Sequence, residues 1–117
     1  MPAEFLAGNR ITLLNSGAEY FPALLSDIAA ARAEIYLESY IFADDAIGHQ
    51  VAGALAGAAA RGVEVNVTVD GFGARNFRAD FLPRLTAAGV RSIFYRPEIS
   101  PFHLHRHRLR RLHRKLV

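Results

Sequence analysis

The sequence predicts an α/β domain with a largely parallel sheet, because short β-branched runs alternate with longer stretches of helical periodicity. The clearest strand is Val63–Val69, where valine alternates with polar residues, and the clearest helical stripe lies between Ile47 and Ala58. Strands joined by helices of this length imply right-handed crossovers. The expected order is βαβαβαβ followed by the start of a further strand, in a mixed sheet with helices on both faces.

The first predicted unit is a strand followed by a helix. Arg10–Leu14 is a short apolar run that ends at Asn15-Ser16-Gly17. The helix is expected from about Glu19 to Arg32, with Pro22 near its first turn, where proline is tolerated. The apolar positions that recur at helical spacing are Phe21, Leu24, Leu25, Ile28 and Ala31.

The second unit begins with a strand over Glu34–Phe42, which is largely apolar on both faces, as a strand covered on both sides requires. Asp44 or Asp45 is expected to cap the helix that follows. Arg61-Gly62 is expected to end that helix before Val63.

The third unit contains a short helix that Asp80 is expected to cap, with Pro83 in its first turn and Gly89 closing it. A strand follows over Val90–Tyr95. Residues 96–107 are expected to form a loop, and residues 109–117 to begin another strand.

The chain has 117 residues and predicts a single domain over 1–117. Residues 1–102 hold eight Arg against eleven Asp and Glu, a net charge of −3, whereas residues 103–117 hold five Arg and one Lys, a net charge of +6. This basic tail favours an anionic partner, whether a phospholipid headgroup, a nucleic acid or a phosphorylated substrate.

The composition also excludes some site classes. There is no cysteine, so disulfides and thiolate metal sites are absent. The longest apolar stretch, Val51–Ala60, is about half of the roughly 20 residues that a membrane-spanning helix needs. Any membrane contact of this chain is therefore expected to be peripheral.

The chemistry-bearing motif lies near the end of the chain, where His113 and Lys115 are two residues apart. On a strand, this spacing places both side chains on one face. An imidazole can attack phosphorus or protonate a leaving oxygen, and an ammonium group can stabilise the non-bridging oxygens. The pair suits a phosphodiester without a metal or cofactor, although a basic surface strand would give the same three residues.

The order of several motifs resembles the N-terminal half of the phospholipase D superfamily, most closely its bacterial cardiolipin synthases. The resemblance runs from about Gly8 to Val117, and the motifs that carry it are FADDAIG at 42–48, RGV at 61–63, DGFG at 70–73 and LHRK at 112–115. His113 and Lys115 match the first two positions of the family's H-x-K-x4-D motif, whose aspartate would follow Val117. The domain is therefore expected to be an incomplete half.

The resemblance implies a mechanism and a setting. Two such motifs meet at one site in the family: one histidine forms a phosphohistidine, and the other protonates the departing alcohol. His113 would be the nucleophile and Lys115 would bind the phosphate. The implied function is cardiolipin synthesis from phosphatidylglycerol at the cytoplasmic face of the bacterial inner membrane, with the fragment itself inactive until it meets the missing half or a homodimer partner.

Other residues have two interpretations each. Asp70 and Gly71 end a predicted strand and form either a substrate-side loop or a plain turn, and Arg114 is a further candidate for binding substrate. Glu38 is either a structural hydrogen-bonding group or a catalytic one. The three alternating histidines form either a basic surface for anionic headgroups or, less in keeping with the arginines around them, a metal site: His103, His105 and His107.

Two further functions stay open from the sequence. A related phosphodiesterase or nuclease would use the same motif on nucleic acid. A non-enzymatic basic module would bind anionic lipid or nucleic acid through its arginine-rich tail.

Overall fold

The computed structural model describes residue 4 and residues 6–39, 42–71, 76–95 and 115–116. Its four-stranded sheet has the order β3-β2-β1-β4, in which β1, β2 and β3 are parallel and β4 is antiparallel to β1. The elements are α1 (Ser16–Ala30), β1 (Glu34–Ser39), α2 (Ala46–Ala60), β2 (Glu64–Asp70), α3 (Phe77–Asp80), α4 (Leu82–Ala88), β3 (Arg91–Tyr95) and β4 (Lys115–Leu116). The α/β class and the largely parallel, mixed sheet are confirmed.

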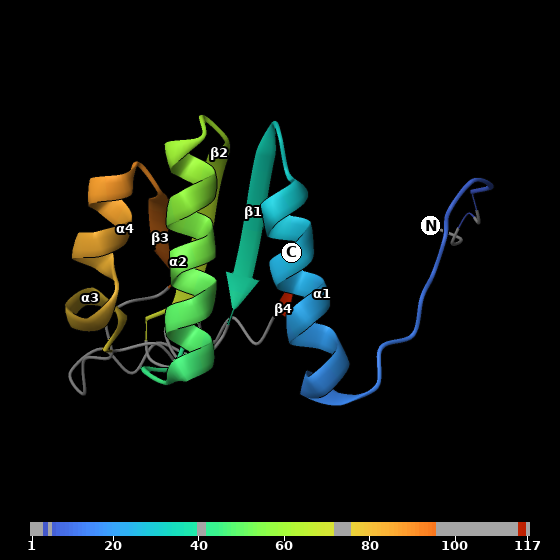
Figure 1. Ribbon diagram of the computed structural model, residues 1–117, viewed down its shortest axis with the longest axis horizontal. Helices are drawn as coiled ribbons and strands as arrows, with labels where there is room; N and C mark the ends of the chain where they lie inside the picture. Colours follow the sequence, from blue (N-terminus) through green and yellow to red (C-terminus); the bar gives the residue numbers. More distant parts are fainter. Residues whose placement is uncertain (1–3, 5, 40–41, 72–75, 96–114, 117) are drawn as a thin grey trace, which may run out of the picture.

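The helices α1, α2 and α4 lie side by side on one face of the sheet (Figure 1). The sequence predicted helices on both faces of the sheet, but in the described part of the chain these helices cover one face. The strand order gives the reason for α2, α3 and α4: β1, β2 and β3 follow one another across the sheet, so successive right-handed crossovers place these helices on the same side.

The predicted strand over Arg10–Leu14 was wrong. This segment has an extended course without strand pairing, and Figure 1 shows it leading away from the sheet. Ile11 is 93% exposed and Leu13 is 83% exposed. β-Propensity measures how well a side chain packs on a pleated surface, and among the described residues this segment has no neighbouring strand to pack against.

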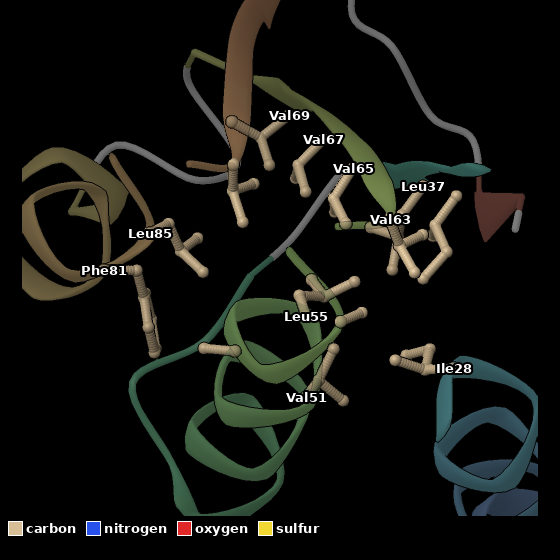
Figure 2. Packing of buried hydrophobic residues seen from close by; sticks show 14 of the residues in the cluster. Ile28, Leu37, Val51, Leu55, Val63, Val65, Val67, Val69, Phe81 and Leu85 are labelled. Atoms are coloured by element: carbon tan, nitrogen blue, oxygen red, sulfur yellow. The ribbon is translucent and has the colours of Figure 1, made fainter. Parts of the chain in front are cut away.

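The core lies between the helices and the near face of the sheet. Val65, Val67 and Val69 of β2 point toward Val51 and Leu55 of α2 (Figure 2). All five are at most 5% exposed. The alternation of the sequence therefore marks the buried face of β2, as a strand covered by helices on one side requires.

A second part of the core is aromatic. The rings of Phe77 and Phe81 are fully buried, and Phe42 meets them at centroid distances of 5.2 and 4.8 Å. Phe94 of β3 lies 5.9 Å from Phe77. This cluster holds the segment after β1 against α3 and α4, which fixes one side of the carboxyl-end edge of the sheet.

The ends of the helices agree with the sequence in some places and differ in others. Asp45 caps α2, as one of the two predicted alternatives, and Gly62 and Gly89 adopt φ values of 92° and 94° after their helices. Asp80, however, ends α3, and Phe81 occupies the cap position of α4. α1 begins at Ser16, so Pro22 lies inside the helix.

Replacing Asp45 with alanine should lower the free energy of unfolding by about 1 kcal/mol, because its Oδ1 accepts a 2.7 Å hydrogen bond from the Gly48 amide at the start of α2. Urea unfolding followed by circular dichroism measures this change. Asp44→Ala is the matched control: among the described residues Asp44 pairs with the half-exposed His49, and such pairs contribute less than about 1 kcal/mol. Equal losses in the two variants would contradict the cap.

Candidate active site

The carboxyl ends of the parallel strands meet at one edge of the sheet. β1 ends at Ser39, β2 at Asp70 and β3 at Tyr95. β4 returns antiparallel to this edge, so that Lys115 pairs with Ser39 and Leu116 with Glu38. Open α/β sheets bind ligands outside the carboxyl ends of their strands, and the second residue of the H-x-K motif lies at this position.

Asp70 is fully buried at the end of β2, where it pairs in register with Tyr95 of β3. The next amide, that of Gly71, donates a 2.9 Å hydrogen bond to the Tyr95 carbonyl oxygen. The ladder between β2 and β3 therefore extends through Gly71. This backbone role is structural, and contact of Asp70 or Gly71 with substrate stays a prediction.

The face of the sheet that points away from the helices is polar near this edge. Glu38 pairs in register with Thr68, and Asp70 lies two residues further along the same face of β2. Glu38 is half-buried, whereas the sequence predicted that its face of the strand would be buried. Tyr95 and Thr68 were not singled out from the sequence. The sequence does contain a signal for this: polar residues alternate with valine along β2, which puts Thr68 and Asp70 on the same face of the strand.

Several predicted site residues lie outside the described residues. These are His113, Arg114 and the three alternating histidines at 103, 105 and 107. Lys115 is described: it lies in β4 and pairs in register with Ser39 of β1. Within residues 6–39, 42–71 and 76–95, no group of three or more His, Cys, Asp or Glu is placed to hold a metal ion.

Two hollows lie beside α1. One, of about 310 Å³, lies between α1, α2 and the carboxyl end of β1. The other, of about 580 Å³, runs between α1 and the outer edge of β1. Tyr20 and Leu24 line both. The first hollow shares Ser39 with the β1–β4 pairing, so it borders β4, the strand that contains Lys115.

None of the described helices is both long enough and apolar enough to cross a membrane.

The chain is similar in sequence to bacterial cardiolipin synthases. Cardiolipin synthase B of Escherichia coli strain K12 is 39% identical over 117 residues, which cover 100% of this chain and 28% of that protein. The major cardiolipin synthase ClsA of Bacillus subtilis strain 168 is 37% identical over 98% of this chain and 24% of that protein. A cardiolipin synthase of Oceanobacillus iheyensis is 34% identical over 88 residues, 75% of this chain and 18% of that protein.

No family model and no solved structure matches the chain. The chain spans about a quarter of the length of the two relatives that match nearly all of it. The similarity nevertheless runs through every described helix and strand, including β4 with Lys115, and the parallel sheet fits the half-domain that the motifs imply. This chain therefore belongs to the phospholipase D superfamily and is of its bacterial cardiolipin synthase type.

Proposed function

We propose that the chain is part of a phosphatidyltransferase that makes cardiolipin from phosphatidylglycerol. The observation that carries the proposal is the 39% identity to cardiolipin synthase B over the whole chain. The position of Lys115 beside the carboxyl end of β1 supports it, because this is the edge at which such sheets bind ligands. The other 72% of that relative has no counterpart in this chain, so a second motif would come from further sequence or from another polypeptide.

The proposed reaction has two steps. The imidazole nitrogen of His113 attacks the phosphorus of phosphatidylglycerol, the phosphorus–oxygen bond to the headgroup glycerol breaks, and a second histidine gives that oxygen a proton. A hydroxyl of a second phosphatidylglycerol then attacks the phosphohistidine, loses its proton to the second histidine, and releases His113 with cardiolipin. Lys115 would stabilise the charge on the non-bridging oxygens.

This scheme assigns different behaviour to the chain and to the complete protein. The 117-residue chain alone is proposed to be inactive, because it supplies one of the two histidines. The complete protein is proposed to act as a peripheral protein at the cytoplasmic face of the membrane, on anionic phospholipid. Arg114, Asp70 and Gly71 are proposed to contact the substrate.

The test incubates the complete product of the reading frame, and separately the 117-residue chain, with phosphatidylglycerol vesicles. We expect equal amounts of cardiolipin and free glycerol from the complete product, and neither from the short chain. A supercoiled plasmid in a parallel reaction tests the nuclease alternative. Plasmid cleavage without cardiolipin or phosphatidic acid would contradict the lipid assignment.

A further inference from the structure

The hollow at the carboxyl end of β1 has the walls of a site for hydrocarbon. Its volume of about 310 Å³ is at the lower end of the range for ligand pockets, roughly 300–1,000 Å³. Most of the side chains around it are aliphatic or aromatic, and they come from α1, β1, α2 and the segment that joins β1 to α2: Phe21, Leu24, Leu37, Phe42, Ile47 and Val51. The polar residues Ser39, Glu38 and Asp45 also border it, with the side chain of Glu38 on the opposite face of the sheet.

The hollow lies next to β4, the strand that contains Lys115 of the H-x-K motif. Ser39 lines the hollow and is also the register partner of Lys115. Paired strands lie about 4.8 Å apart, so the backbone at Lys115 is one strand spacing from the wall. A phosphodiester that reacts at this strand would have its substituents within reach of the hollow.

We propose that this hollow binds the first part of an acyl chain of the reacting phospholipid, an inference that rests on the proposed function. A phospholipid joins a phosphodiester to hydrocarbon through a few bonds, which matches a phosphate motif bordered by an apolar hollow. A nucleic acid has no aliphatic part to fill these walls. The carboxylate of Asp45 further disfavours a second phosphate there.

The absence of tryptophan from the sequence makes a direct test possible. Tyr20 lines the hollow and is 36% exposed, so Tyr20→Trp places a single indole at its wall. The 117-residue variant is titrated in detergent micelles with phosphatidylglycerol that carries bromine on its acyl chains, a contact quencher of indole fluorescence. We expect a loss of fluorescence that saturates with lipid and is absent with unbrominated phosphatidylglycerol.

Two matched variants separate binding in the hollow from general adsorption. Ala60→Trp places the indole at the exposed far end of α2 and should show no saturable loss. Adding Ile47→Phe to Tyr20→Trp fills the hollow and should abolish the loss. If circular dichroism shows that Tyr20→Trp does not fold, Phe21→Trp, at the same wall, takes its place.

The inference is overturned by equal quenching at positions 20 and 60, by no quenching at position 20, or by quenching that survives Ile47→Phe. Each of these results would mean that no acyl chain binds specifically in the hollow. Failure of the proposed function is a separate result: the complete product would form no cardiolipin while saturable quenching at position 20 persists.

Discussion

Replacing His113 with alanine in the complete protein is expected to lower cardiolipin formation by about 10³-fold or more, because the proposed covalent step loses its nucleophile. Thin-layer chromatography of radiolabelled lipid products measures the rate. The relation of His113 to Lys115 in the motif gives the physical reason: the imidazole would attack the phosphorus whose non-bridging oxygens the ammonium group stabilises.

The role of His113 as nucleophile, and not only as proton donor, has its own measurement. Phosphatidylglycerol labelled in its phosphatidyl part should leave label on the protein after a rapid denaturing quench, and His113→Ala should remove that label. His49→Asn is the matched control, because His49 lies on α2, pairs with Asp44, and has its ring centroid 4.9 Å from that of Phe81, away from β4. Label that persists in His113→Ala would assign the covalent step to another residue.

The sequence predicts those parts of the fold that depend on local pattern. Valine alternates with polar residues over Val63–Val69 because one face of β2 meets α2, so this strand can be predicted from its own segment alone. Asp45 and Gly62 mark the ends of α2 by capping and left-handed geometry, which are also local.

Other parts depend on which strands become neighbours, and no local pattern contains that information. Arg10–Leu14 has the composition of a strand, yet strand structure requires a partner's backbone, and the described part of the chain offers none beside it. The position of α2, α3 and α4 on one face follows from the order β3-β2-β1-β4.

The candidate site shows the same division. The sequence alone pairs His113 with Lys115 as candidate site residues, because they lie two positions apart in one short motif. The pairing of Lys115 with Ser39, and of Asp70 with Tyr95, joins residues far apart in the chain. Glu38 and Thr68 meet for the same reason, so the polar surface at the end of β1 and β2 becomes visible only when the register is known.

Replacing Gly48 with alanine is expected to lower the free energy of unfolding by about 3 kcal/mol, at the upper end of the usual cost of overpacking. A Cβ atom at this buried position would lie 1.9 Å from the carbonyl oxygen of Ala43, a backbone atom that cannot rotate away. The clash would displace the segment that joins β1 to α2. That segment carries Phe42 into the aromatic cluster with Phe81 and Asp45 to the cap of α2.

Gly57→Ala is the matched control on the same helix, and urea unfolding of the 117-residue chain compares the two. Gly57 is exposed, and a Cβ atom there would meet only Arg61 Nη1 at 4.0 Å. Alanine should therefore stabilise that position by roughly 0.5–1 kcal/mol through its helix propensity. The two substitutions add the same methyl group to the same helix, so opposite signs isolate the contact with Ala43. Equal midpoints would mean that α2 does not approach the carbonyl of Ala43, and the wall of the proposed acyl-chain hollow formed by Ala43, Ile47 and Gly48 would have to be redrawn.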